Sequence, residues 1–398
     1  QGSHPVGWCP VDQNPVSQHD TMGDVEPKIN NENYLVKFRL DEFVFPITTL
    51  RPETIFGITN LWVNPNTTYK KIKADDEKWI VSEECAEKLE FFGKEITIEG
   101  DIKGTEIIGK FAKAPHTEQE IPIFEAEFVE SGMGTGLVMS VPAHAPKDYQ
   151  ALMDLKSKNH ELASKIEPIP IISTEGYGNI PAKDVCERLG VTDQVDAKLE
   201  EATEELYLKE FVNGKLNERC GDFVNEKVEF GRNKVRDWLK DKNELESFPT
   251  LQNSPIRCRC GSECVVKILN NQWFLNYGDE EWKTLARNCL DSMNILPNKI
   301  KTEFHDVINW LHERACARQQ GLGTKLPWDN DWIVESLSDS VIYMAYYTLS
   351  RFVNDGTVQA DNLTKEFFDY VFLDKGSIDA VASSSNLSED IINTMKKE

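Results

Sequence analysis

The sequence lacks several features that would place it in a common class of protein. It contains no run of about 18 apolar residues, so we expect no transmembrane helix and no membrane partner. It shows no signal peptide, no P-loop and no Ser-His-Asp order. Basic residues are scarce, because 44 Lys and Arg are outnumbered by 67 Asp and Glu, for a net charge of −23. This balance counts against a nucleic-acid partner, although a local basic groove can coexist with an acidic remainder.

A disulfide framework is not indicated either. The nine cysteines are an odd number at irregular spacings, and Cys258, Cys260 and Cys264 crowd into "CRCGSEC". This pattern favours a reducing, cytoplasmic compartment and a metal site. Zinc takes four ligands in a tetrahedron, and "WCPVDQNP" offers Cys9, followed at the CxxC spacing by Asp12. We expect structural Zn²⁺ at Cys9 and the three clustered cysteines, with Asp12 as an alternative ligand. The other interpretation is a turn with unpaired thiols.

The length and composition indicate a folded protein. The 398 residues are 40% hydrophobic and 10% aromatic, which suits about two to three domains. The start, "QGSHP", is typical of a residual tag, so residues 1–4 are set aside. The chain then begins at "VGWCP" without an initiator Met, which suggests a fragment of a longer protein.

Short β-rich runs, broken by Gly and Pro, dominate the chain after Tyr34. They predict a mainly β, barrel-like domain. The runs span residues 34–40, 43–50, 96–100, 105–111, 121–129 and 134–141. Helices are predicted between and after them, at residues 82–95, 145–165, 191–211 and 228–242.

The composition changes near Pro249. The cysteine cluster and predicted strands come first, followed by predicted helices at 280–293, 301–323 and 383–398. The apolar segment 336–353 is compatible with a helix or with a buried strand, because periodicity alone cannot decide. If Cys9 joins the distant cysteines, residues from about 33 to 249 are an insertion within a small zinc module.

The segment "SGMGTGLVMSVPAHAPKDY" holds the next candidates. Gly132, Gly134 and Gly136 lead into a strand, whereas a dinucleotide fingerprint must lead into a helix. They therefore favour a bulge or a close backbone approach at a ligand site. His144 is a candidate substrate-binding residue or a loop histidine without a special role. Asp148 either interacts with the dipole of its own helix or holds a cationic ligand group.

These segments together resemble a known family. "TTLRPETIFG", Thr48 to Gly57, combined with "GTGLVMSVPAHAPKDY", is similar to the editing insertion of class I aminoacyl-tRNA synthetases for branched aliphatic amino acids. "QWFLNYG", "WLHERACARQQGLGTKLPWD" and "WIVESLSDSVIYMAYYT" resemble the archaeal and eukaryotic type of leucyl-tRNA synthetase. The resemblance covers the chain after the tag.

The resemblance implies an α/β architecture with nested parts. A β-barrel-like editing domain, residues 33–249, would be inserted in a zinc-ribbon-like module formed by residues 5–32 and 250–276. Residues 277–398 would form part of the second half of a Rossmann-type catalytic domain. The HIGH-type motif would lie upstream of Val6 and the KMSKS-type motif downstream of Glu398. The fragment should therefore not activate leucine, whereas its parent enzyme would ligate leucine to tRNA(Leu) using ATP.

The family also implies a reaction and roles for particular residues. The editing domain hydrolyses the ester of a mischarged aminoacyl-tRNA, for example one carrying norvaline, isoleucine or methionine. Asp148 matches the aspartate that holds the α-ammonium, and Thr54 the threonine that blocks leucine. Thr48 and Thr49 match the threonines at the scissile ester. Arg51 would position the tRNA end or the threonine loop. No acid-base residue is evident, so we expect water to attack through positioning, helped by the terminal ribose hydroxyl.

Two alternative hypotheses account for the same residues. An isoleucyl- or valyl-tRNA synthetase editing fragment shares the threonine motif and the aspartate, but Thr54 and "SLSDSVIYMAYY" favour leucine. A non-catalytic, zinc-stabilised module that binds RNA or protein is favoured by the net charge of −23. Hydrolysis of leucyl-tRNA by a Thr54 variant would separate editing from mere binding.

Overall fold

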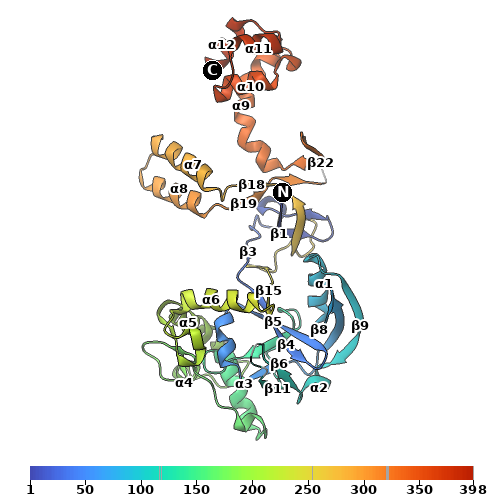
Figure 1. Cartoon of the computed structure of the whole chain (residues 1–398), viewed down its shortest axis with the longest axis vertical. Coiled ribbons are helices and arrows are strands. Elements are labelled where there is room, and N and C mark those ends of the chain that lie inside the picture. Colours follow the sequence, from blue (N-terminus) through green and yellow to red (C-terminus); the bar gives the residue numbers. More distant parts are fainter. Residues whose placement is uncertain (116, 118, 253, 320–321, 398) are drawn as a thin grey trace. The chain divides into compact units, whose positions relative to one another are not determined.

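The computed structural model describes residues 1–115, 117, 119–252, 254–319 and 322–397, with backbone only for 336–342. The chain forms two compact units (Figure 1). One is His4–Leu269, and the other combines Gln1–Ser3 with Asn270–Glu398. Both units mix helices and strands, as expected. None of the helices in the described part of the chain is long and apolar enough to cross a membrane.

A 10-stranded sheet forms the centre of the first unit, in the order β12-β6-β11-β10-β4-β5-β8-β7-β9, with β15 paired to β4. Its strands are β4 (Tyr34–Leu40), β5 (Phe43–Thr49), β6 (Asn60–Val63), β7 (Thr68–Ala74), β8 (Glu77–Val81), β9 (Ile96–Lys103), β10 (Phe111–Lys113), β11 (Glu120–Glu125), β12 (Leu137–Ser140) and β15 (Leu245–Ser247). The two-residue turn between β4 and β5 contains Asp41 at φ 54°, the positive φ that tight hairpins require.

The sheet is open, so the predicted barrel closure is wrong for the described residues. The end strands, β12 and β9, do not pair with each other there. The sheet instead packs against helices on both faces. Along β4, Val36 and Phe38 enter the core that holds Val235 of α6, whereas Leu35 enters the core that holds Leu89 of α1. Successive side chains of a strand point to opposite faces. Helices cover both faces of this sheet, and the sheet does not close on itself.

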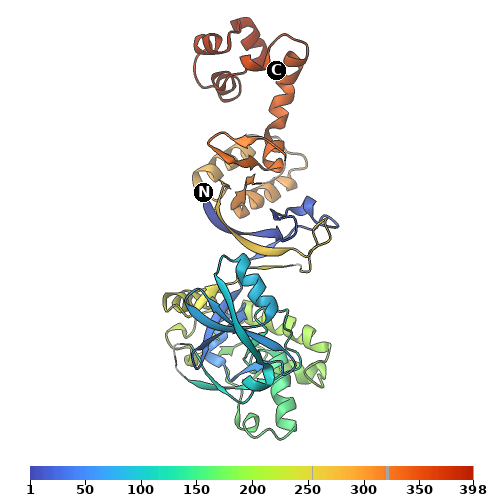
Figure 2. The ribbon, with the colours of Figure 1, turned by 90° about the vertical axis from the view of Figure 1, so that its right-hand side faces the viewer.

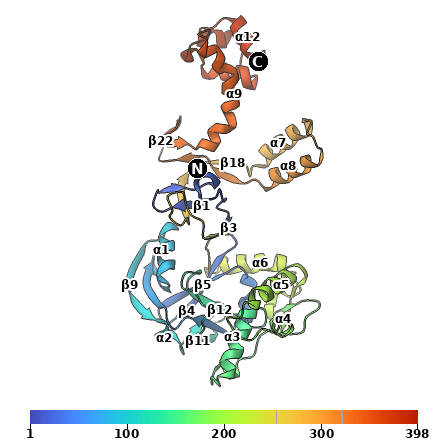
Figure 3. The ribbon, with the colours of Figure 1, turned by 180° about the vertical axis from the view of Figure 1, so that it is seen from behind.

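Six helices accompany this sheet: α1 (Glu83–Phe91), α2 (Gly104–Ile107), α3 (Pro146–Ser157), α4 (Pro181–Leu189), α5 (Lys198–Asn213) and α6 (Val228–Asp241). Figures 1 and 3 show α4, α5 and α6 on the side of the unit away from α1 and β9. Of these helices, α1 and α6 confirm the helices predicted at 82–95 and 228–242. The helices predicted at 145–165 and 191–211 are confirmed in part, because α3 ends at Ser157 and α5 begins at Lys198. The predicted strand at 105–111 is wrong over Thr105–Ile107, which belong to α2. There the Glu106 carboxylate accepts the Lys103 N–H at 2.9 Å and closes a helical turn.

A smaller group of strands flanks this sheet. β17 (Val265–Gln272), β1 (Gly2–Cys9) and β2 (Asn14–Pro15) form one sheet, and Figure 2 shows β1 and β17 as long neighbouring strands. Residues 2–4, set aside as a tag, thus belong to β1. β3 (Ile29–Asn30) pairs with β16 (Thr250–Leu251), and β13 (Ile172–Ser173) pairs with β14 (Lys215–Leu216). Residues 30 and 250, far apart in sequence, therefore lie opposite each other on adjacent strands.

The second unit contains short antiparallel strands and helices. The strands are β18 (Phe274–Asn276), β19 (Glu313–Ala315), β20 (Ala317–Arg318), β21 (Lys325–Leu326) and β22 (Asp329–Val334). The helices are α7 (Glu280–Ser292), α8 (Lys299–Trp310), α9 (Ser336–Asn354), α10 (Lys365–Leu373), α11 (Ile378–Ser385) and α12 (Glu389–Lys397). A Rossmann-type sheet is parallel, whereas the described strand pairs here are antiparallel, so that expectation is not confirmed.

Two predictions for this unit are resolved by the structure. The segment 336–353 is a helix, within α9. The helix predicted at 301–323 is wrong beyond Trp310, since Leu311 is extended and Glu313–Ala315 pairs with β18. Tertiary strand pairing overrides helix propensity there. Gln320 and Gly321, also within that prediction, lie outside the described residues.

Candidate active site and candidate metal centre

One pocket of about 980 Å³ in the first unit collects the predicted site residues. The residues that line it include Thr48, Thr49, Arg51, Thr54, His144 and Asp148. Two segments far apart in sequence therefore form facing parts of the same pocket. The first is the end of β5 with the 3-10 turn Pro52–Gly57, and the second runs from the glycines before β12 to the first turn of α3.

The threonine segment is organised by the backbone of Arg51. The Arg51 N–H donates to Thr49 Oγ1 at 3.0 Å. The Arg51 carbonyl accepts from Thr54 Oγ1 at 2.7 Å and from the Thr54 N–H at 3.0 Å. Thr54 is 3% exposed, so its position is tightly restrained. Two of the three predicted threonines thus have hydroxyls fixed by their own loop.

Thr48 is restrained by a glycine of the opposite segment. Gly134 has φ +57°, and a Cβ added to it would lie 2.1 Å from Thr48 Oγ1. Only glycine suits both the positive φ and this close approach. The glycine-rich segment therefore makes a close backbone approach at the pocket, one of the two alternatives that its pattern left open.

Asp148 lies in the first turn of α3 and is buried at the pocket. Its Oδ1 accepts from Trp62 Nε1 at 3.0 Å, and its Oδ2 accepts from the Val141 N–H at 2.8 Å. Burial raises the pKa of the Asp148 carboxyl to about 7, although these two hydrogen bonds oppose the shift. A buried carboxylate that lines a pocket favours a cationic ligand, because an opposite charge restores its ionised form.

Arg51 and His144 are joined by a residue that the sequence analysis missed, Glu210 of α5. Glu210 Oε2 accepts from Arg51 Nη2 at 2.6 Å, and Oε1 lies 2.6 Å from His144 Nδ1. Glu210 and His144 are both 0% exposed. Arg51 also bonds Glu53 through Nε at 3.1 Å and stacks over the Tyr207 ring, 4.4 Å from its centroid.

The charges of this cluster stabilise one another. Burial would raise the pKa of Glu210, but Arg51 and His144 outweigh it, and the pKa lies below its ordinary value. Burial would lower the pKa of Arg51, but Glu210 and Glu53 raise it above the ordinary value. Removing one partner of such a buried pair costs about 3–5 kcal/mol, because the other charge stays buried without compensation.

A helical pattern could have identified Glu210. Leu199, Ala202, Leu206 and Glu210 are the buried residues of α5, at the i, i+3, i+4 spacing of an apolar stripe. A glutamate in such a stripe is rarely buried unless it is paired. The sequence thus shows that Glu210 needs a partner, but not which partner.

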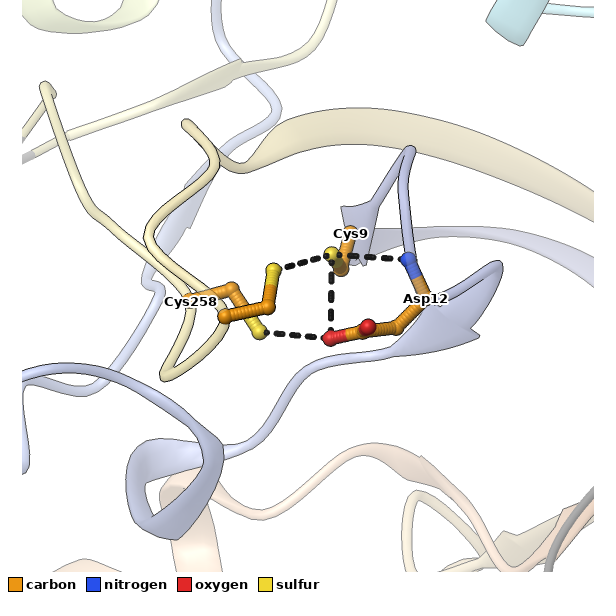
Figure 4. Close-up of side chains that lie close together, drawn as sticks. Cys9, Asp12 and Cys258 are labelled. Carbon is orange, nitrogen blue, oxygen red and sulfur yellow. Dashed lines mark hydrogen bonds between the residues drawn. The ribbon is translucent and has the colours of Figure 1, made fainter.

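The candidate metal centre groups Cys9, Asp12, Cys258 and Cys260. One ligand atom from each lies within 4.8 Å of all the others. Asp12 Oδ2 accepts from Cys9 Sγ at 3.4 Å and from Cys258 Sγ at 3.2 Å, as Figure 4 shows. Three thiols and a carboxylate are donors that Zn²⁺ accepts in a tetrahedral site. Hydrogen bonds from these cysteines lower the pKa of Asp12, and the bond from Cys258 has the largest effect.

Cys264, the fourth cysteine predicted as a ligand, is not in this group. It is buried in a small core with Val16 and Ile256. Gly261, at φ +91°, closes the turn in which its own N–H donates to the Cys258 carbonyl at 2.8 Å. This turn brings Cys258 and Cys260 toward Cys9, so the geometry supports Asp12, the alternative ligand, as the fourth donor.

Comparisons with known proteins agree on one family. Residues 31–167 match a family described as "Leucyl-tRNA synthetase, editing domain". The chain is 45% identical over 421 residues to a leucine–tRNA ligase of Methanococcus maripaludis, and 44% identical over 413 residues to one of Methanocaldococcus jannaschii. Both alignments cover 100% of this chain but 43% of the relative, so the chain spans less than half of their length.

A solved structure shows the same fold for part of the chain. It is the editing domain of the cytosolic leucyl-tRNA synthetase of P. knowlesi, 18% identical, with a TM-score of 0.50. The match covers 56% of this chain and 97% of that domain.

Proposed function

The chain belongs to the leucyl-tRNA synthetase family, and from this premise we propose that its pocket hydrolyses the ester of tRNA(Leu) charged with a wrong amino acid. The main support for the proposal is that the threonine segment and Asp148 line the same pocket. A synthetic site cannot reject a near-isosteric aliphatic side chain by more than about 1–3 kcal/mol, so a second, hydrolytic site is needed.

In this proposal Asp148 binds the α-ammonium of the aminoacyl group. Its hydrogen bonds to Trp62 and to the Val141 N–H fix the carboxylate at the pocket. The ammonium would stabilise the ionised carboxylate and lower its raised pKa. This fixes the amino end of the substrate, so that the ester lies near the threonine segment.

Thr48 and Thr49 would face the ester, and Thr54 would exclude leucine. The Arg51 backbone holds the hydroxyls of Thr49 and Thr54, and the close approach of Gly134 restrains Thr48. This arrangement suits a reaction driven by orientation of water and stabilisation of the oxyanion. The Arg51 guanidinium forms ion pairs with Glu53 and Glu210. This supports its role in positioning the threonine loop rather than the tRNA end.

His144 was predicted to be either a substrate-binding residue or a loop histidine without a special role, and its contacts favour a third role. Its Nε2 accepts from the Ile171 N–H at 2.8 Å and from the Ile172 N–H at 3.3 Å. With Nδ1 bonded to Glu210, both ring nitrogens have protein partners. We propose that His144 supports the pocket wall and does not itself hold the substrate.

The roles of the segments outside the pocket domain are proposed from the family. Residues 5–32 and 250–276 would form the zinc-ribbon-like module around Cys9, Asp12, Cys258 and Cys260, where Zn²⁺ would stabilise the fold. Residues 277–398 would belong to the catalytic domain of a parent enzyme that joins leucine to tRNA(Leu) with ATP. The described cysteines are free thiols, which supports a reducing cytoplasmic setting.

The test is deacylation of mischarged tRNAs by the 398-residue chain. We expect hydrolysis of tRNA(Leu) carrying norvaline, isoleucine or methionine, and little hydrolysis of leucyl-tRNA(Leu). Mischarged tRNAs for isoleucine and valine serve as comparison substrates. Preference for one of these would favour the isoleucyl or valyl alternative. Binding of tRNA without hydrolysis would favour a non-catalytic module.

A further inference from the structure

We propose that Glu210 is a positioning residue that sets the distance between the two walls of the pocket. The inference rests on the proposed editing function. Glu210 comes from α5, outside the residues 31–167 that match the editing-domain family. Its carboxylate bridges Arg51 of the threonine segment and His144 of the opposite segment, with both contacts at 2.6 Å.

Glu210 is connected to the threonines through Arg51. Glu210 fixes the Arg51 guanidinium, and the Arg51 backbone holds Thr49 at 3.0 Å and Thr54 at 2.7 Å. A displacement of Arg51 would therefore move the hydroxyl proposed to lie near the ester. It would also move the side chain proposed to exclude leucine.

Glu210 is also connected to Asp148, through His144 and Val141. The His144 N–H donates to the Val141 carbonyl at 2.9 Å, and the Val141 N–H donates to Asp148 Oδ2 at 2.8 Å. The Arg51 guanidinium also donates from Nη1 to the His144 carbonyl at 3.4 Å. One carboxylate thus connects the proposed ammonium anchor and the proposed size filter through short chains of hydrogen bonds.

The contacts of His144 show which of its nitrogens carries the proton. Nε2 accepts two backbone N–H groups, so it has no proton, and Nδ1–H donates to Glu210. A glutamine at position 210 could still accept from His144. Its neutral side chain would lose the charged contact to Arg51, so the threonine wall should loosen more than the opposite wall.

The test compares Glu210→Gln with Glu204→Gln, the same change at an exposed site of the same helix. Single-turnover deacylation and tRNA affinity are measured at a temperature where both variants are folded by circular dichroism. For Glu210→Gln we expect the deacylation rate at saturating protein to fall about tenfold or more. The affinity for tRNA should stay within about twofold of that of the unmutated 398-residue chain. We also expect measurable hydrolysis of leucyl-tRNA(Leu). Glu204→Gln should match the parent chain.

The outcomes separate this inference from the proposed function. If the parent chain edits and folded Glu210→Gln edits at the same rate with the same exclusion of leucine, Glu210 has only a structural role. If the parent chain itself does not deacylate, the proposed function fails first. If Glu210→Gln does not fold, Arg51→Lys provides the second variant. It keeps the buried positive charge but lacks the planar fork that reaches Glu53 and Glu210 together. It should show the same two defects, and parental behaviour would overturn the proposal.

Discussion

Asp148 determines the expected pH dependence of the site at the scale of single residues. Burial raises its pKa to about 7, so the free protein holds more of the neutral carboxyl as the pH falls below that value. The substrate α-ammonium stays protonated below about pH 7.7. Only the ionised carboxylate binds it well, so the KM for deacylation should rise by up to about tenfold per pH unit below pH 7.

Deacylation kinetics between pH 5.5 and 7 test this expectation. The Asp148→Asn variant is the control, because its side chain cannot ionise. It should show a high KM with no inflection near pH 7. An inflection that persists in Asp148→Asn would assign the titration to another group.

A rise in pH should lower the stability of the folded chain, although it strengthens the binding of substrate. The folded-state pKa of Asp148 is raised, so the unfolded chain ionises first as the pH rises above about 3.9. The folded state then loses stability until the pH passes about 7. Asp148→Asn removes this penalty, so its melting temperature relative to the parent should be higher at pH 8 than at pH 4. A difference independent of pH would contradict the raised pKa.

Thr54 should determine which amino acid is hydrolysed. It is 3% exposed and lines the pocket, so Thr54→Ala would open space where the leucine side chain is proposed to collide. We expect the variant to hydrolyse correctly charged leucyl-tRNA(Leu), which the unmutated chain should spare. Thr59→Ala, a buried threonine of the same unit that is not among the pocket-lining residues, should leave this discrimination unchanged. Continued protection of leucyl-tRNA by Thr54→Ala would refute the size-filter role.

The site was predictable where residues form local motifs and unpredictable where they pair over long range. Thr48, Thr54 and Asp148 come from ordered motifs, and all of them line one pocket. Glu210 lies far from both motifs in sequence, and only folding places its carboxylate beside Arg51. Asp12 illustrates the intermediate case, since its spacing from Cys9 made it a candidate but could not decide between it and Cys264.

At the scale of elements, the segment before β12 constrains the threonine wall. Gly134→Ala would place a methyl group 2.1 Å from Thr48 Oγ1, so Thr48 or the loop must move. We expect deacylation to fall about tenfold or more through misplacement near the ester. Gly176→Ala is the matched control, because Gly176 has φ +90° and an added Cβ meets nothing within 4 Å. Both variants share the cost of a positive φ, so equal activities would show that the contact with Thr48 is unimportant.

Turn chemistry explains which elements the sequence pattern failed to predict. The hairpin β7–β8 was missed, although Asp75 at φ 53° marks a tight turn between its strands. The strand β6 is four residues long and fully buried, so it shows no alternation of polar and apolar residues. The open form of the sheet was also unpredictable, because barrel closure depends on whether the first and last strands meet.

At the largest scale, the candidate metal centre joins the two ends of the first unit, since its ligands come from residues 9–12 and 258–260. We expect the purified chain to contain about one Zn²⁺, bound by the closed four-ligand site that structural zinc requires. Asp12→Ala should reduce the zinc content and the melting temperature, whereas Cys264→Ala should retain the metal. Elemental analysis after dialysis provides the measurement. Loss of zinc in Cys264→Ala but not in Asp12→Ala would reverse the ligand assignment.

The central claim is that this pocket hydrolyses mischarged tRNA(Leu) with Asp148 as its anchor. Single-turnover deacylation of isoleucyl-tRNA(Leu) by the parent chain and by Asp148→Ala tests it most directly, with tRNA binding measured in parallel. We predict rapid release of isoleucine by the parent chain and a loss of at least about a hundredfold in the folded variant, equivalent to about 2.7 kcal/mol. Equal rates for the two proteins, or tRNA binding by the parent chain without release of isoleucine, would contradict the account.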